Sequence, residues 1–306
     1  MIYSVSKHTE VPFFFMDKMM EMIRNDGADY QIKNSEGKLS TQRINLSMKD
    51  TTGLVFWSKN WEHYFQYQEE IENKYRVVYN HSAPLLPVEL SSSQFFSSID
   101  EEIAHLGEAI DIFRGRLNWH LQPILLTDIT PPEYYIEIVK DTLRTLFGEP
   151  GSKVAPLRSV VIQLFHESTT SGPRMASFEY YNSVGYKPLD WKSMAEFINK
   201  LAKIFNEYQG LNLESCMNPF LVVHKSMKNS ACVSIDHFTS EYPVQGDGLR
   251  SPLASYNETY KNFLNRSMYG DNCKCSPSVD LGLLFDPCPG KCIYCSEMTG
   301  LDVIKE

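Results

Sequence analysis

"VDLGLLFDPCPGKCIYC", residues 279–295, is the stretch that decides the fold. It joins an apolar run of strand type, residues 279–285, to a short loop with three cysteines in the spacing C-x3-C-x2-C: Cys288, Cys292 and Cys295. Two prolines and a glycine in and around this loop disfavour a helix and let the sulfur atoms turn toward one centre. The stretch therefore predicts a buried strand that leads directly into a metal-binding loop.

Strand-like and helical patterns alternate along the rest of the chain. Short apolar, β-rich runs predict strands at residues 2–6, 53–58, 76–82, 116–122, 159–167, 211–216 and 279–285. Apolar residues at helical spacing predict helices at residues 11–25, 61–74, 93–115, 132–147, 192–209 and 255–266. Repeated strand–helix units predict an α/β fold, and this number of strands favours a complete or partial (β/α) barrel over an open sheet. We expect one domain, residues 1–306, with a cysteine-rich last third at residues 216–295.

Composition and charge limit the class of protein and of partner. The chain is 42% hydrophobic and 22% charged, which is typical of a folded globular protein. We expect no membrane partner, because no apolar run is long enough to span a bilayer. The polar opening residues lack the apolar core of a signal peptide, so we expect a cytoplasmic protein. The net charge of −9 and the lack of a basic stripe disfavour nucleic acid and favour a small neutral or cationic substrate.

All seven cysteines of the chain follow residue 215. An odd number of cysteines in a reducing compartment argues against a disulfide framework, so their grouping indicates one or two metal centres. Three local thiolates can hold a cubane iron–sulfur cluster and leave one iron open to a small molecule. The alternative is a zinc site that takes a fourth cysteine from elsewhere, in a zinc-stabilised binding module without catalysis.

The full motif, C-x3-C-x-Tyr-C with Tyr294 before the last cysteine, resembles the signature of the radical S-adenosylmethionine superfamily. The resemblance implies a [4Fe–4S] cluster on Cys288, Cys292 and Cys295, S-adenosylmethionine as second cofactor, and a reducing partner such as flavodoxin or ferredoxin. It also implies a circularly permuted barrel, because this motif usually lies near the N-terminus of the superfamily's proteins. Residues 279–285 would then form the first strand and residues 2–6 the next.

Further stretches resemble a bacterial family with an uncharacterised domain. They are the opening MIYSVSKHTEVPFF, FWSKN at residues 56–60, the segment from Trp119 to Asp128, and the closing segment 273–295. This resemblance implies a second site, for zinc or an auxiliary iron–sulfur cluster, formed by Cys216, Cys232, Cys273 and Cys275. Burial in an apolar core is the alternative for the first two of these. The chain departs from the family pattern at residues 7–10 and 121–122, which indicates a specialised subgroup.

The ends of the expected strands supply the remaining candidates, because functional side chains of such barrels gather where the strands end. As cofactor-binding residues we expect Lys59, Asn60 and Tyr294. As catalytic residues we expect Glu10, His120 and Glu167. As substrate-binding residues we expect His8, Asn80, Gln122, His166 and Glu214. A lone histidine at a strand end is more often a structural group, so a structural role remains open for each histidine.

In size, C-terminal cysteine motif and permuted order the chain resembles the queuine lyases. That resemblance implies a lyase that uses the adenosyl radical to break the C–N bond of queuine and release 7-aminomethyl-7-deazaguanine in queuine salvage. A small substrate with a cationic amine suits an acidic protein. A radical lyase that acts on damaged nucleic acid is the alternative enzyme, and the missing basic stripe argues against it.

Overall fold

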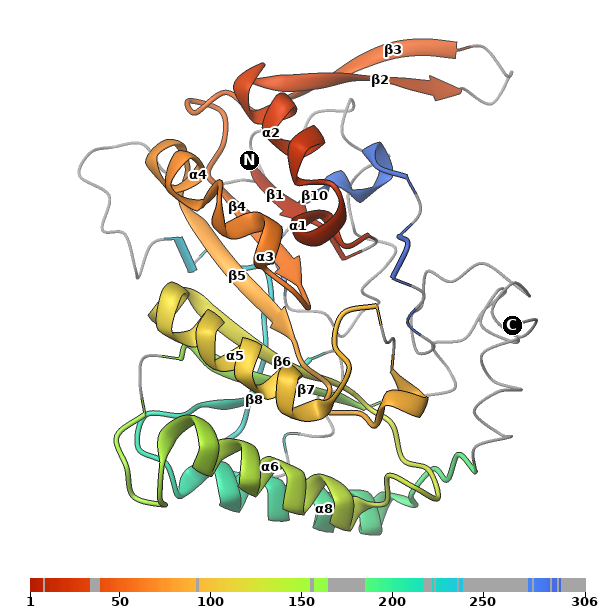
Figure 1. Cartoon of the computed structure of the whole chain (residues 1–306), viewed down its shortest axis with the longest axis vertical. Coiled ribbons are helices and arrows are strands. Elements are labelled where there is room, and N and C mark those ends of the chain that lie inside the picture. Colours follow the sequence, from red (N-terminus) through yellow and green to blue (C-terminus); the bar gives the residue numbers. More distant parts are fainter. Residues whose placement is uncertain are drawn as a thin grey trace. The chain divides into compact units, whose positions relative to one another are not determined.

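The structure of the chain is a computed structural model. It describes residues 1–7, 9–33, 39–91, 94–154, 157–164, 185–216, 222, 224–235, 237–238, 275–276, 278–286, 288–290 and 292. Its main element is an eight-stranded parallel sheet in the order β10-β1-β4-β5-β6-β7-β8-β9 (Figure 1). These strands are β1 (Ile2–Val5), β4 (Gly53–Ser58), β5 (Val77–Ser82), β6 (Leu117–Ile124), β7 (Ser159–Leu164), β8 (Leu213–Ser215), β9 (Lys228–Asn229) and β10 (Val279–Asp280). The predicted α/β class with a parallel sheet is confirmed, and within the described residues the strand order has two ends, β10 and β9.

Helices follow most of the strands. They are α1 (Val11–Phe14), α2 (Met16–Arg24), α3 (Glu62–Phe65), α4 (Gln68–Lys74), α5 (Ile99–Phe113), α6 (Pro132–Phe147) and α8 (Trp191–Asn206). Short 3-10 turns occupy Val88–Leu90, Arg114–Arg116 and Leu281–Leu284. Residues 26–52, for which the sequence analysis predicts no element, contain an antiparallel hairpin of β2 (Gly27–Lys33) and β3 (Leu39–Asn45). No helix within the described residues combines the length and the apolar character needed to cross a membrane.

The strand next to the cysteine loop pairs with the first strand of the chain. β10 runs parallel to β1, with Val279 opposite Tyr3 and Asp280 opposite Ser4. On its other side β1 pairs in parallel with β4, and Val5 lies opposite Phe56. The expected neighbourhood of residues 279–285 and 2–6 is therefore confirmed. The expected strand is too long, however, because the side chain of Asp280 accepts a hydrogen bond from Gly282 N at 2.8 Å and starts a 3-10 turn.

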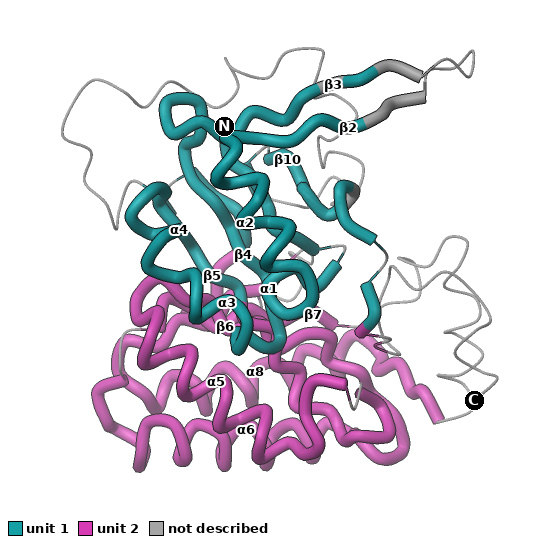
Figure 2. Tube along the Cα trace, turned by 45° about the horizontal axis from the view of Figure 1, so that its top comes forward, with its two compact units in different colours: residues 1–80, 231–271, 275–289 teal, residues 81–230, 272–274, 290–306 magenta. Residues whose placement is uncertain are grey.

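Two compact units divide the chain, and Figure 2 colours them separately. The first comprises residues 1–80, 231–271 and 275–289, and the second comprises residues 81–230, 272–274 and 290–306. The single domain expected from the sequence stays a prediction.

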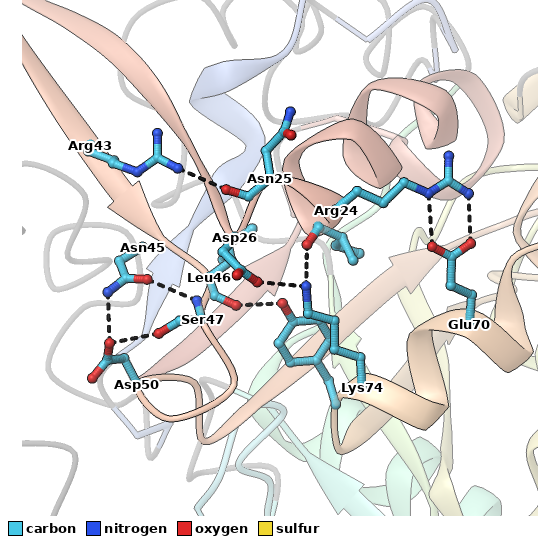
Figure 3. A network of polar contacts seen from close by, with 12 residues as sticks. Arg24, Asn25, Asp26, Arg43, Asn45, Leu46, Ser47, Asp50, Glu70 and Lys74 are labelled. Atoms are coloured by element: carbon cyan, nitrogen blue, oxygen red, sulfur yellow. Dashed lines mark hydrogen bonds and ion pairs between the residues drawn. The ribbon is translucent and has the colours of Figure 1, made fainter.

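The first unit is built on strands buried over their whole length. Every residue of β1 and of β4 is buried, the pattern of parallel strands covered on both faces. The hairpin lies beyond α2 in Figure 1, and polar contacts tie this region together (Figure 3). The guanidinium of Arg43 on β3 donates to Asn25 O at 2.8 Å, and Lys74 Nζ at the end of α4 donates to the Asp26 carboxyl at 2.7 Å.

The second unit contains β6 to β9 together with α5, α6 and α8, and α6 runs beside α8 (Figure 1). Local capping decides where two of these helices begin. Ser98 accepts a hydrogen bond from Glu101 N at 3.1 Å, so α5 starts at Ile99 and not at residue 93 as expected. Asp190 accepts hydrogen bonds from two backbone N–H groups of the first turn of α8, which starts at Trp191.

Two of the expected helices are each interrupted by a short break. The single helices expected at residues 11–25 and 61–74 are each divided in two, the first at Phe15, whose φ of −132° lies outside the helical region. The helix expected at residues 132–147 has the expected bounds. The helix expected at residues 255–266 and the last residues of the strand expected at 159–167 lie outside the described residues.

Candidate functional site

The carboxyl ends of β1, β4 and β10 bring polar side chains to one edge of the first unit. The parallel register places these three strand ends side by side, as in other parallel sheets where ligands bind beyond the carboxyl ends. Lys7 and Glu10 follow β1, Lys59 follows β4, and Asp280 ends β10. The ammonium group of Lys7 lies 4.3 Å from the centre of the Trp57 ring, a cation–π distance.

Glu10 is half-buried and accepts hydrogen bonds at one carboxyl oxygen, Oε1. Its donors are the hydroxyl of Ser58 and Lys59 N, the latter at 3.1 Å. Burial raises the pKa of Glu10 from 4.5 to about 7, and it outweighs the opposing effects of the Ser58 hydroxyl, the Lys59 charge and Lys59 N. The sequence predicted a functional Glu10, and its altered pKa near neutrality is a property that catalytic acids and bases share.

Ser58 explains why a neutral Glu10 fits this position. Its hydroxyl lies within hydrogen-bond distance of two acceptors, Glu10 Oε1 and Asn60 O, the second at 2.6 Å. One hydroxyl proton serves only one of them at a time. A protonated Glu10 can donate to Ser58 Oγ, which then donates to Asn60 O, so every group in the chain of contacts is satisfied.

Asp280 gathers four donors at its two carboxyl oxygens and is only 2% exposed. Oδ1 accepts from Ser6 Oγ at 2.5 Å and from Gly282 N at 2.8 Å. Oδ2 accepts from Ser4 Oγ at 2.9 Å and from Lys7 N at 3.2 Å. Sequence analysis did not identify Asp280 or Ser58, although an acidic residue inside the apolar run 279–285 is a signal that buried partners must exist.

The three motif cysteines are described in part. Cys288 is half-buried and Cys292 is buried, neither is in a disulfide, and Cys292 Sγ lies 3.9 Å from Gly290 O. Cys295 and the adjacent Tyr294 lie outside the described residues. Among the residues that are described, no three histidine, cysteine or acidic side chains form a group that could hold a metal ion. In donor chemistry the motif fits an iron–sulfur cluster, because such clusters are held by cysteine thiolates.

The second cysteine set is also described in part. Cys216 and Cys232 are almost fully buried, Cys275 is half-buried, and Cys273 lies outside the described residues. In the first unit the segments of Cys232 and Cys275 run next to each other. Val233 N donates to Cys275 Sγ at 3.4 Å, and Ser276 N donates to Val233 O at 2.7 Å. Backbone N–H donation to sulfur suits a metal-bound thiolate, because it stabilises negative charge on the sulfur atom.

Two asparagines of the predicted site make structural contacts. Asn60 is buried, and its Oδ1 accepts from Glu62 N at 2.9 Å in the first turn of α3. Asn80 is fully buried on β5, and its Nδ2 donates to Cys232 O at 3.2 Å. The first contact closes a turn at the start of α3, and the second fixes the backbone of a cysteine.

The predicted residues of the second unit lie on its strands. His120 is fully buried on β6, and the half-buried Gln122 follows two residues later. The Oε1 atom of Gln122 is shielded from water and accepts no hydrogen bond from any described residue. Glu214 on β8 is half-buried, and burial raises its pKa more than Ser230, Arg158 and Lys228 lower it. His8, His166 and Glu167 lie outside the described residues.

Comparison with protein-family models gives a match over most of the chain. A family model described as a domain of unknown function (DUF1848) matches residues 2–296. The matched span contains both cysteine sets and the strand ends described above. Comparisons with curated proteins and with solved structures gave no match.

Proposed function

We propose that this chain, which belongs to the family described as a domain of unknown function (DUF1848), is a radical S-adenosylmethionine enzyme. The observation that carries the proposal is the junction of β10 with the cysteine motif. β10, which pairs in parallel with β1, leads toward Cys288, the first cysteine of the C-x3-C-x-Tyr-C motif, and Glu10 and Lys59 follow β1 and β4 at the same strand edge. Cys288, Cys292 and Cys295 would hold a [4Fe–4S] cluster through their thiolates.

The proposed fold is a complete or partial (β/α) barrel in circularly permuted order. The pairing of β10 with β1 supports it, because the last strand of the chain precedes the first strand in the sheet order. In an unpermuted chain of the same topology, β10 and its cysteine loop would come first and β1 second. The pairing joins segments 276 residues apart in sequence, as in the contact between Ser4 and Asp280.

The proposed roles of the residues follow from their positions. When bound, S-adenosylmethionine supplies a 5′-deoxyadenosyl radical, and a flavodoxin or ferredoxin supplies the electron that this requires. Lys59, at the same strand edge, would pair with the cofactor carboxylate, and Tyr294 would lie beside the cluster. Glu10, with its pKa near 7, would hold or deliver a proton at a polar group of the substrate. The further catalytic candidates are His120 and Glu167.

For the substrate we propose queuine, with cleavage of the bond between the cyclopentene ring and the amine nitrogen. Gln122 Oε1, which accepts no hydrogen bond from any described residue, and the half-buried Glu214 are acceptors of the kind that the N–H groups of a deazaguanine need. The net charge of −9 favours a cationic amine. Cys216, Cys232, Cys273 and Cys275 would form a second site for zinc or iron–sulfur, supported by the N–H contact to Cys275.

The test compares two matched triple cysteine variants after anaerobic reconstitution. In the first, Cys288, Cys292 and Cys295 are changed to alanine, and in the second, Cys216, Cys232 and Cys275. We expect wild type and the second variant to convert S-adenosylmethionine to 5′-deoxyadenosine under reducing conditions, and the first variant to form none. Equal cleavage of S-adenosylmethionine by both variants, or a wild type that binds zinc but no iron, would overturn the radical assignment. Either result would favour the alternative function, a zinc-stabilised binding module.

The substrate requires its own measurement. Wild-type protein is incubated with queuine and reductant, and the base is analysed by mass spectrometry. We expect 7-aminomethyl-7-deazaguanine to appear, and we expect Glu10→Gln to lower its formation more than it lowers uncoupled cleavage of S-adenosylmethionine. Unchanged queuine in the presence of cofactor cleavage would exclude this substrate, and turnover of damaged DNA under the same conditions would favour the alternative lyase.

A further inference from the structure

Contacts from β1, from α2 and from the residues on either side of α1 hold the segment between β10 and the first motif cysteine at several described positions in the first unit. Asp280 bonds to the end of β1, as described above. Lys18 Nζ on α2 donates to Leu284 O at 2.6 Å and lies 5.3 Å from the centre of the Phe285 ring. That ring is buried and lies 5.7 Å from the Phe15 ring. The hydroxyl of Thr9 donates to Asp286 O at 3.3 Å, two residues before Cys288.

We propose that Asp280 is a positioning residue: it fixes this segment against the carboxyl end of β1 and thereby presents the Cys288 thiol in place before a cluster binds. The segment has only two residues of β-pairing, which is too short a ladder to fix its direction alone. Three of the hydrogen bonds to Asp280 fix the end of β10 against Ser4, Ser6 and Lys7. The fourth, from Gly282 N, starts the 3-10 turn Leu281–Leu284. The inference rests on the proposed function in one respect, the identity of Cys288 as a cluster ligand.

An asparagine at this position cannot reproduce the contacts of Asp280. Each carboxyl oxygen accepts from one serine hydroxyl and one backbone N–H. The hydroxyl of a serine can rotate and accept from an amide NH2, but a backbone N–H can only donate. Whichever way the amide of Asp280→Asn is turned, its NH2 group faces either Gly282 N or Lys7 N. One buried N–H therefore loses its acceptor, and the segment is released at its start.

The experiment measures thiol reactivity in the apoprotein, so it does not depend on a cluster. The full chain is treated with N-ethylmaleimide under reducing conditions, and the rate constant at each cysteine is obtained by peptide mass spectrometry. We expect Asp280→Asn to raise the rate at Cys288 about fivefold, because the released segment opens more often, and to leave Cys275 of the same unit nearly unchanged.

The matched control is Glu72→Gln, the same change of carboxyl to amide in the same unit. Glu72 accepts from Tyr79 OH at 2.6 Å and from Gln68 Nε2 at 2.8 Å, and neither partner belongs to the segment before Cys288. We expect no change at Cys288 in this variant. An unchanged Cys288 rate in a folded Asp280→Asn protein, or an equal rise in Glu72→Gln, would overturn the positioning role.

A milder variant and a spectrum complete the test. If Asp280→Asn does not fold by circular dichroism, Ser6→Ala removes a single donor at 2.5 Å and should give a smaller rise at Cys288, and no rise would refute the proposal. After iron and sulfide are added, we expect Asp280→Asn to bind less iron than Glu72→Gln or to shift the electron paramagnetic resonance spectrum of the reduced cluster. A wild type that binds no iron would refute the proposed function, whereas the thiol rates would still decide the role of Asp280.

Discussion

Replacement of Glu10 by glutamine is expected to stabilise the fold in a pH-dependent way. The glutamine amide oxygen can accept from Lys59 N and, when the single Ser58 proton points to it and not to Asn60 O, from Ser58 Oγ, as the charged carboxylate does. What the variant loses is the ability to become charged. Because burial disfavours the charged form of Glu10, the wild-type protein bears a penalty at neutral pH that Glu10→Gln does not.

The sign and size of this effect follow from the two pKa values. The pKa of Glu10 is 4.5 when solvated and about 7 in the fold, so the folded protein binds the proton more tightly than the unfolded chain. The corresponding stability is fully present below pH 4.5 and is lost as the pH rises to about 7. A difference of about 2.5 in pKa corresponds to about 3 kcal/mol in the free energy of unfolding.

The assay is urea unfolding of both proteins, followed by tryptophan fluorescence, at several pH values from 4 to 8. We expect the stability of Glu10→Gln relative to wild type to rise by about 3 kcal/mol between pH 4.5 and pH 7 and then to stay level. The control is Glu70→Gln, because the hydrogen bond from Arg24 lowers the pKa of Glu70 and gives the opposite pH dependence. A difference that is flat across this range, or that follows Glu70→Gln, would refute the reasoning.

Two further predictions concern packing and buried hydroxyl groups. Gly53→Ala should destabilise the protein by about 1–3 kcal/mol in urea unfolding, because the new Cβ would lie 2.2 Å from the fully buried Phe238 ring. The control is Gly107→Ala, inside α5, which should be neutral or stabilising, since its Cβ meets the end of the flexible Leu146 side chain at 3.1 Å. Equal destabilisation by the two glycine variants would contradict this prediction. Tyr79→Phe should lower the free energy of unfolding by about 1–3 kcal/mol, because it removes the hydroxyl that bonds to Glu72 at 2.6 Å and to Tyr64 OH at 2.8 Å. An unchanged unfolding midpoint would show that these two groups find other partners.

Most strands of the sheet could be predicted from the sequence because burial on both faces leaves a continuous apolar run, whereas the exposed two-residue strand β9 was not predicted. GLVFWS at residues 53–58 is the clearest case, since all its residues are buried and the expected bounds are the observed ones. The hairpin β2–β3 had no such run: β3 (LSTQRIN) is mostly polar, and among the described strands the two pair only with each other. The break at Phe15 was not predictable either, because the apolar spacing of residues 11–25 continues across it.

The sequence indicates candidate site residues where the residue type by itself restricts the chemistry that a side chain can perform. The cysteine spacing and the acidic residue after β1 are such signals, and Glu10 does lie in a setting that perturbs its pKa. Asn60 and Asn80 have the same polar character, but Asn60 closes the turn before α3 and Asn80 bonds to Cys232 O. Serines give no signal of their own, so the partners of Glu10 and Asp280 became visible only when the register of β10, β1 and β4 was known.

Glu10 and Asp280 illustrate how one edge of a sheet can hold both a structural carboxyl group and one that we propose to be functional. Among the described residues, Asp280 accepts four hydrogen bonds, whereas Glu10 accepts at a single oxygen and shares its serine proton with Asn60 O. A buried polar group that forms all its hydrogen bonds stabilises the fold. A buried polar group that lacks some of them lowers the stability of the fold. The same chemical change should therefore have opposite effects. Glu10→Gln should stabilise the protein at neutral pH, and Asp280→Asn should destabilise it by about 1–3 kcal/mol, because a buried backbone N–H is left without an acceptor.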